Sequence, residues 1–366
     1  MTPLAQFHAS SYQMPCPYGV VLVMSPWNYP FMLTIDPLID AIAAGNTVMV
    51  KPSAYSPYTS QIIEEILTNV FPKEYVSVIL GGRKENQALL EEKFDYIFFT
   101  GSPSVGHEVM SKASVHLTPV TLELGGKSPC IVDETANIKL AARRIVFGKY
   151  LNLGQTCVAP DYIYVHTSVK DKLIHEVIQE IKRQYQDLSS YGKIINEKHF
   201  DRISKLLDPN KIVYGGKTNR ETLKIEPTIM DHVSWDDAVM QEEIFGPIMP
   251  ILTFTNFEDC INIIKEKPSP LALYLFSSNK TRVDMVTHSV PYGGGCINDT
   301  IIHLATSNMP FGGVGNSGMG GYHGKEGFKT FTHYKSIVDK KTWLDLPIRY
   351  QPYSKLYDKL IHIFLR

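Results

Sequence analysis

Long apolar runs, a leader segment and an excess of one charge are all missing from this chain of 366 residues. No uninterrupted apolar stretch approaches the roughly 20 residues that a membrane-spanning helix needs. The first ten residues contain no basic segment followed by an apolar one. The formal net charge is -1, so no strong field attracts nucleic acid or an anionic membrane. These absences predict a soluble protein whose partner is a small molecule.

Cysteine is scarce and scattered along the sequence. The five residues are odd in number and never spaced as C-x-x-C, which argues against a disulfide framework or a structural zinc site. A reducing, cytoplasmic setting is therefore predicted, without a bound metal. The cysteines are Cys16, Cys130, Cys157, Cys260 and Cys296.

Several common catalytic and nucleotide-binding motifs are also missing. The sequence has no G-x-S-x-G and no H-E-x-x-H. A phosphate-binding P-loop ending at Lys127 would need glycine at position 121, where Thr121 stands. No G-x-G-x-x-G follows a strand-like run, so an ordinary Rossmann fingerprint is excluded.

What is present is an alternation of short apolar runs with helix-like segments, which is typical of parallel strands joined by crossover helices. A first series ends near residue 124, and the alternation restarts near residue 128. Residues 60–70 form a helix-like segment with Ile62, Ile63, Ile66, Leu67 and Val70 on one face. The glycine-rich stretch 312–321 is predicted to be an extended loop. The fold class is therefore α/β, with two stacked domains.

The segment Phe98–Gly106 follows a strand-like run and resembles the start of a helix. Ser102 suits the N-cap and Pro103 the first helical position, which leaves free backbone N–H groups facing outward. Such a terminus can seat a pyrophosphate, and an ordinary capped helix would show the same pattern.

Cys157 differs from the other cysteines because it lies in a loop, Asn152–Pro160, after a helix-like segment. Backbone N–H groups in such a loop can lower the pKa of a thiol and stabilise a neighbouring oxyanion. The other cysteines lie in strand-like or helical runs or between prolines, where an inert thiol is expected. Position alone leaves Cys157 open as a nucleophile or as a bystander.

Five motifs together resemble those of the aldehyde dehydrogenase superfamily, and the segments LGGKSPC and GQTCVAPDY resemble its class-three or fatty-aldehyde branch. The resemblance runs in order from about residue 17 to residue 335. The motifs are Ser25–Pro30, Leu122–Pro129, Gly154–Cys157, Gln241–Pro247 and Pro310–Gly315.

This resemblance implies oxidation of aldehydes to carboxylic acids, with Cys157 as the covalent nucleophile. It assigns Asn28 to the oxyanion and Glu123 to the general base of thioester hydrolysis. Glu243 matches the residue that holds the nicotinamide ribose and is implied to share the role of base. Glu242 is expected to be a solvated neighbour.

The resemblance also implies NAD or NADP as cofactor. Lys51 matches the residue that contacts the adenosine ribose, and Phe245 is expected to pack near the nicotinamide ring. The pyrophosphate is expected to meet Gly101, Ser102 and Gly106. A hydrophobic aldehyde is the implied substrate, and the protein is expected to be a homodimer.

The implied domains are a Rossmann-like cofactor domain over residues 1–125, a catalytic domain over 126–330 and an oligomerisation or gate segment over 331–366. Residues 1–18 are expected to join the oligomerisation element. Helices that precede the corresponding segment in the family have no counterpart before Met1, so apolar surface is expected to be exposed on the cofactor domain. Ala54 stands where the branch usually has a glutamate that contacts the adenosine ribose.

Two other activities remain open at this stage. One is an acylating dehydrogenase, which would pass the acyl group to coenzyme A instead of water. The other is an inactive remnant that acts only as an oligomerisation partner of a full-length relative. The presence of both Glu123 and Glu243 favours hydrolysis.

Overall fold

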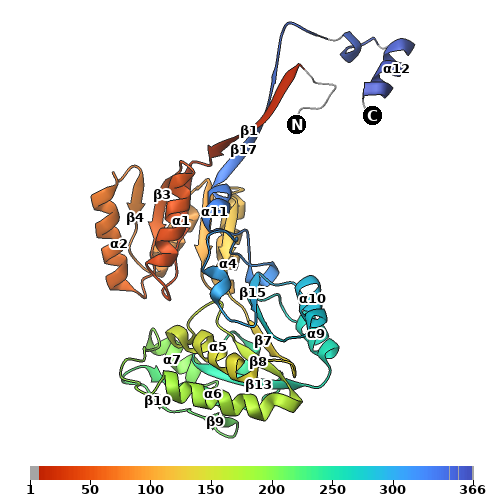
Figure 1. Cartoon of the computed structure of the whole chain (residues 1–366). Helices are drawn as coiled ribbons and strands as arrows, with labels where there is room; N and C mark the ends of the chain where they lie inside the picture. Colours follow the sequence, from red (N-terminus) through yellow and green to blue (C-terminus); the bar gives the residue numbers. More distant parts are fainter. Residues whose placement is uncertain (1–7, 346, 353, 365–366) are drawn as a thin grey trace.

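The computed structural model describes residues 8–345, 347–352 and 354–364. Two sheets, each covered by helices, form the body of the molecule, and a two-stranded ribbon projects from it (Figure 1). This arrangement confirms the α/β class. The division into domains at particular residues stays a prediction.

The first sheet has six strands in the order β16-β6-β5-β2-β3-β4, and only β16 runs antiparallel to its neighbour. Its central strand β5 is buried along its whole length, because helices cover both faces of a parallel sheet, and all of its residues except Thr100 are hydrophobic. The strands are β2 (Val20–Met24), β3 (Thr47–Lys51), β4 (Val76–Val78), β5 (Tyr96–Thr100), β6 (Val120–Glu123) and β16 (Gly318–Met319).

Four helices connect the strands of this sheet. They are α1 (Met32–Ala43), α2 (Pro57–Val70), α3 (Arg83–Glu91) and α4 (Pro103–Val115). The helix predicted over residues 60–70 is confirmed as part of α2, and the strand and helix start predicted around Ser102 are confirmed as β5 and α4. The predicted loop 312–321 is wrong in part, because Gly318 and Met319 pair with β6 and form an edge strand.

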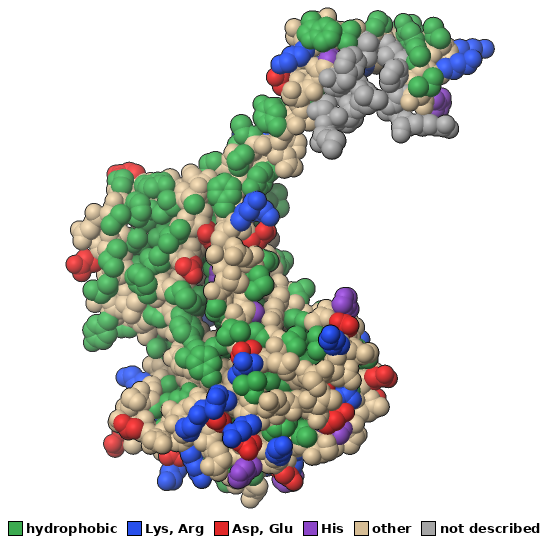
Figure 2. Space-filling model, viewed as in Figure 1, with side chains coloured by type: hydrophobic (Ala, Val, Ile, Leu, Met, Phe, Trp, Pro, Cys, Tyr) green, Lys and Arg blue, Asp and Glu red, His purple; other side chains and the backbone are tan. Residues whose placement is uncertain are grey.

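The apolar face predicted for α2 is only half packed. Ile63 and Leu67 are buried, whereas Ile62, Ile66 and Val70 are exposed. Only the i, i+4 stripe reaches the sheet, and no described element covers the other apolar side chains. Figure 2 shows the resulting apolar surface over α1 and α2. The expectation of exposed apolar surface on this half of the molecule is confirmed.

The second sheet has seven strands in the order β15-β14-β7-β8-β13-β12-β9, parallel except for β9. Its helices are α5 (Ile138–Tyr150), α6 (Lys170–Gln184), α7 (Glu197–Ser204), α8 (Ala238–Gln241), α9 (Phe257–Lys265) and α10 (Lys280–Ser289). Its strands are β7 (Pro129–Val132), β8 (Tyr162–His166), β9 (Ile212–Tyr214), β12 (Thr228–Met230), β13 (Ile248–Phe254), β14 (Ala272–Phe276) and β15 (Gly294–Ile297). A separate small hairpin pairs β10 (Thr218–Asn219) with β11 (Lys224–Ile225).

The projecting ribbon joins the two ends of the chain. Strand β1 (Ala9–Pro17) pairs antiparallel with β17 (Thr332–Lys340), which follows α11 (Gly324–Thr330). Helix α12 (Lys355–Phe364) lies beyond the ribbon, away from both sheets (Figure 1). The first seven residues of the predicted oligomerisation element lie outside the described residues. Within the described part of the chain, no helix is both long and apolar enough to cross a membrane.

Candidate active site

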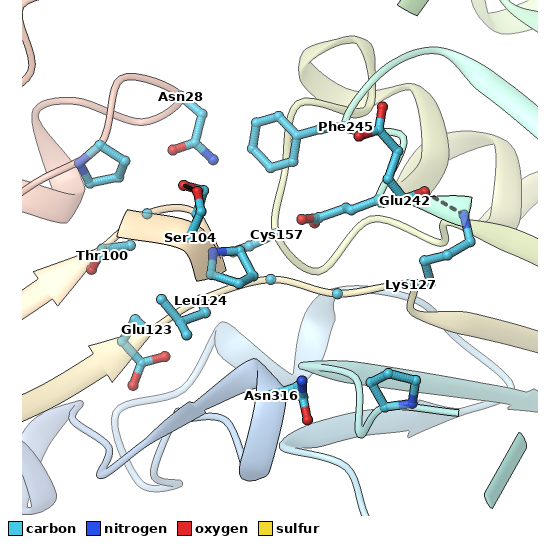
Figure 3. Close-up of a pocket in the computed structure, with 18 of the residues that line it drawn as sticks. Asn28, Thr100, Ser104, Glu123, Leu124, Lys127, Cys157, Glu242, Phe245 and Asn316 are labelled. Carbon is cyan, nitrogen blue, oxygen red and sulfur yellow. Dashed lines mark hydrogen bonds between the residues drawn. The ribbon is translucent and has the colours of Figure 1, made fainter. Parts of the chain in front are cut away.

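A cleft of about 690 Å³ lies where loops of the two halves of the molecule meet. It gathers seven of the nine residues predicted for the site, from segments far apart in the sequence. In the close-up, Asn28 and Phe245 lie above Cys157, and Glu123 lies below it (Figure 3). The seven residues are Asn28, Gly101, Ser102, Glu123, Cys157, Glu243 and Phe245.

The remaining two predicted residues, Lys51 and Gly106, do not line this cleft. The Lys51 ammonium is buried and donates to the carbonyls of Pro52 at 2.9 Å and Gly81 at 2.7 Å. Gly106 lies in the first turns of α4 against Leu124, where a Cβ would come within 2.8 Å of the leucine side chain. Gly106 therefore lets α4 approach the strand beneath it.

Cys157 is placed by a sharp reversal of the chain after α5. Asn152, Leu153 and Gly154 have φ angles of 49°, 56° and 70°, a left-handed conformation that side chains other than asparagine's disfavour. Any Cβ on Gly154 would collide with the backbone of Gly246. The reversal thus packs directly against the turn that carries Glu243.

Asn28 is tied to the same loop. Its side-chain amide donates to the carbonyl of Gln155 at 3.1 Å, and the Asn152 amide donates to the carbonyl of Asn28 at 3.0 Å. The Tyr29 hydroxyl bonds that of Thr156 at 2.8 Å. A primary amide has two N–H donors, so Asn28 retains one for a ligand beside Cys157.

The resting thiol of Cys157 is neutral. Burial, followed by the charges of Glu243 and Glu123, raises its pKa to about 12, although its own N–H and that of Val158 act in the opposite direction. The sequence-based expectation that N–H groups lower this pKa is therefore wrong for the net effect, because burial outweighs them. For Cys157 to act as a nucleophile, a base would have to take the thiol proton.

Two carboxyl groups are available near the thiol. Burial and the nearby Asp161 raise the pKa of Glu243 to about 8, close to the value that suits a general base at neutral pH. Burial raises the pKa of Glu123 well above its ordinary value, and neither of its oxygens has a hydrogen-bond partner among the described residues. Glu242 is exposed, as expected, and pairs with Arg202 at 2.9 Å.

The other end of the cleft can accept a dinucleotide. Helix α4 begins at Pro103 after Ser102, whose side chain makes no capping hydrogen bond. The first N–H groups of this 13-residue helix are therefore open to an anion at the positive end of its dipole. Phe245 stands further along the cleft and contacts Trp27 edge-on, with 5.4 Å between ring centroids. A pyrophosphate and an aromatic ring fit these two places.

Sequence reasoning missed three charged residues around Glu243: Lys127, Asp161 and Arg202. All three bond the segment 239–244 through side-chain or backbone atoms. Lys127 stands in a glycine motif after a strand, which is a usable signal. Arg202 lies in α7, where nothing in the local pattern sets it apart.

Comparison with known proteins gives one consistent result. Residues 2–337 match the Aldehyde dehydrogenase family. The chain is 50% identical to a 4,4'-diaponeurosporen-aldehyde dehydrogenase of Staphylococcus aureus, over 100% of this chain and 81% of that protein. It is 46% identical to the mouse aldehyde dehydrogenase described as dimeric and NADP-preferring, over 88% of this chain and 72% of that protein.

A solved structure of Staphylococcus aureus AldH in a substrate-bound state superposes with a TM-score of 0.98 at 50% identity, covering 100% of this chain and 81% of that one. This likeness extends over both sheets and the cleft between them. The chain belongs to the aldehyde dehydrogenase family, in its class-three branch, and is an enzyme that oxidises aldehydes with NAD or NADP as cofactor.

Proposed function

We propose that this enzyme oxidises hydrophobic aldehydes to free carboxylic acids through a covalent intermediate on Cys157. The single observation that carries this proposal is that Cys157, Asn28 and Glu243 share one cleft with the open N-terminus of α4. A nucleophile, an oxyanion donor, a base and a cofactor seat are thereby within one site.

In the first half of the reaction, the Cys157 sulfur attacks the aldehyde carbon and its proton passes to Glu243. The resulting oxyanion is held by the free N–H of Asn28 and by the backbone N–H of Cys157, and losing one such donor typically costs about 100- to 1000-fold in rate. NAD or NADP, held at Phe245 and Glu243, would supply the hydride acceptor that this step needs. The carbon left on Cys157 is then a thioester.

In the second half, Glu243 first releases the thiol proton to solvent and then takes a proton from water, and the resulting hydroxide attacks the thioester carbon. The C–S bond breaks, the acid leaves and Cys157 regains a proton. We assign this base role to Glu243 rather than Glu123 because its pKa of about 8 lies near working pH and its charge acts more strongly on Cys157. Burial raises the pKa of Glu123 well above its ordinary value, which disfavours its carboxylate form.

The cofactor seat also involves Glu243 and Phe245. Phe245 is proposed to pack against the nicotinamide ring and Glu243 to hold its ribose, while Gly101 and Ser102 meet the pyrophosphate. Lys51 and Gly106 support the seat from beneath, since neither lines the cleft. The Lys51 ammonium is proposed to turn from its backbone carbonyls to the adenosine ribose.

The substrate and the assembly are proposed by similarity. The Staphylococcus aureus relative is named for a carotenoid-type aldehyde, which supports a hydrophobic aldehyde for this chain. The mouse relative is described as dimeric, and the projecting β1–β17 ribbon here exposes Tyr12, Met14 and Val338. We propose a homodimer joined through this ribbon. Five free thiols support a cytoplasmic location.

The direct test measures cofactor reduction with a series of aliphatic and aromatic aldehydes, with and without coenzyme A. We expect reduction and free acid in both cases. A strict requirement for coenzyme A would establish the acylating reaction instead. Absence of turnover in a dimer that binds NAD or NADP would identify an inactive partner.

A further inference from the structure

The segment 242–247, which carries Glu243, has no regular secondary structure of its own. It follows α8, which ends at Gln241, and precedes β13, which begins at Ile248. Phe245 within it has a φ of 48°, a left-handed conformation that costs energy for a residue with a side chain. Contacts from elsewhere must therefore hold the segment and Glu243 with it.

Lys127 and Asp161 supply those contacts from the buried side. The Lys127 ammonium donates to the carbonyl of Glu242 at 2.8 Å, a bond drawn in Figure 3. It also bonds one carboxylate oxygen of Asp161. The other oxygen of Asp161 accepts the N–H of Ile244 at 2.8 Å. The Lys127–Asp161 ion pair thus holds, by hydrogen bonds, the backbone immediately before and immediately after Glu243.

Burying the charged side chains of Lys127 and Asp161 costs free energy. The Asp161 side chain is only 4% exposed and that of Lys127 20%, so each charge has lost most of its water. Lys127 also donates to the carbonyl of Val239 at 2.9 Å. Such fully used donors and acceptors make a rigid link between the start of β7, the start of β8 and the segment 242–247.

The Glu243 carboxylate lies on the backbone of the same loop that supplies Lys127. It accepts the N–H of Gly126, and a Cβ on Gly125 would collide with its oxygens. Lys127 therefore continues directly from the two glycines on which Glu243 rests. A movement of Lys127 or Asp161 would shift both the base and the surface beneath it.

We propose that Lys127 and Asp161 are positioning residues that hold Glu243 against Cys157 for both proton transfers. This inference rests on the proposed role of Glu243 as the base. Neither residue is assigned contact with substrate: they act by fixing the backbone on both sides of Glu243 and by setting the charge around its carboxylate.

The charges facing Glu243 give the two residues opposite signatures. Asp161 raises the pKa of Glu243, whereas Lys127 and Arg202 lower it. Lys149 and Cys157 also interact electrostatically with Glu243. Asp161→Asn should therefore lower this pKa, so that activity begins to rise at a lower pH. Lys127→Met should raise it, so that activity begins to rise at a higher pH.

The experiment compares the pH dependence of kcat in the full chain and its variants, at saturating cofactor and aldehyde. Asp161→Asn keeps the shape of the side chain and removes its charge. The matched control is Asp133→Asn, since Asp133 is also buried, pairs with Arg282 at 3.0 Å and stands at the opposite end of β7. Melting temperatures are measured for every variant.

We expect Asp161→Asn and Lys127→Met each to lower the maximal kcat by roughly 10- to 100-fold, as a misplaced catalytic group does. The pH at which kcat rises should move in opposite directions in the two variants. Asp133→Asn should keep both the maximal kcat and the pH dependence of the native enzyme. Adding Glu243→Gln to either variant should cause no further loss beyond Glu243→Gln alone. If Asp161→Asn does not fold, the partly exposed Lys127 carries the same test.

Two results would overturn the inference in distinguishable ways. If Glu243→Gln is slow but both variants keep the native kcat and pH dependence, Glu243 is the base and needs no such positioning. If Glu243→Gln turns over like the native enzyme, the proposed base is wrong and the positioning role fails with it. If the pH at which kcat rises moved in the same direction in both variants, the effect would be a general structural one. The same would follow if the loss of kcat in either variant added to that of Glu243→Gln.

Discussion

Replacing Gly125 by alanine should slow catalysis strongly while leaving the fold nearly intact. A Cβ at this position would lie 2.6 Å from Oε1 and 2.8 Å from Cδ of Glu243, whereas ordinary contact begins at 3.4 Å. Oε2 would lie nearer still, so the carboxylate must retreat by about 1 Å. The backbone of Gly125 has no left-handed φ, so alanine adds no conformational strain of its own.

The magnitude follows from this displacement. A catalytic group misplaced by about 1 Å can lose up to about 100-fold in rate, so we expect kcat to fall by one to two orders of magnitude. The atom that must move is the end of a flexible side chain, which keeps the loss of stability near the low end for over-packing, at about 1 kcal/mol. Activity and stability should thus separate.

The assay measures kcat at saturating NAD or NADP beside the melting temperature. Gly82→Ala is the control, because its Cβ would meet only Ala54 at 4.0 Å, and it should retain the native kcat. Glu243→Gln combined with Gly125→Ala should be no slower than Glu243→Gln alone. A Gly125→Ala enzyme with native kcat would refute the placement of Glu243 as the base.

Four further outcomes are expected. Cys157→Ala should abolish aldehyde oxidation and retain binding of NAD, measured by fluorescence titration; substantial turnover would rule out the nucleophile. The kcat should rise with pH through about 8, because burial raises the pKa of Glu243 to about 8 and only its carboxylate form accepts a proton; a flat profile would contradict this. Burial raises the pKa of Glu123, so the folded protein binds this proton more tightly than the unfolded chain. Stability therefore falls as the pH rises above the pKa that Glu123 has in the unfolded chain. Glu123→Gln should therefore raise the melting temperature by a few degrees in alkaline buffer and less in acid, and equal shifts at both would argue against a protonated Glu123. Ala54→Glu should increase the ratio of catalytic efficiency with NAD to that with NADP by roughly tenfold or more. The glutamate would accept a hydrogen bond from the adenosine ribose of NAD and repel the phosphate on that ribose in NADP. An unchanged ratio would show that Ala54 does not set cofactor choice.

Much of the architecture follows from local patterns. Buried parallel strands such as β5 and β14 are apolar at nearly every position, and this makes them visible as short runs between helical segments. The edge strand β16 does not follow from a local pattern. Gly318–Met319 joins the first sheet only because the chain returns to the edge of β6, and its own residues have no strand signature.

Motifs also identified most of the candidate site. Asn28 and Cys157 are singled out from two separate motifs, and the fold does bring these motifs together, because Asn28 bonds Gln155 across 127 positions. The electrostatic state of Cys157 was not predictable in the same way. Its loop supplies the expected N–H groups, but burial under distant segments raises the pKa of the thiol to about 12.

The sequence by itself determined the alternation of strands and helices and the motif loops, including the one that carries the candidate nucleophile Cys157, because each depends on neighbours within a few residues. Only the tertiary structure decided what surrounds Glu243. Asp161 meets Lys127 across 34 positions and Ile244 across 83, so no local pattern records these contacts. Burial, which sets the pKa of Cys157 and of Glu243, likewise exists only once both sheets have packed around the cleft.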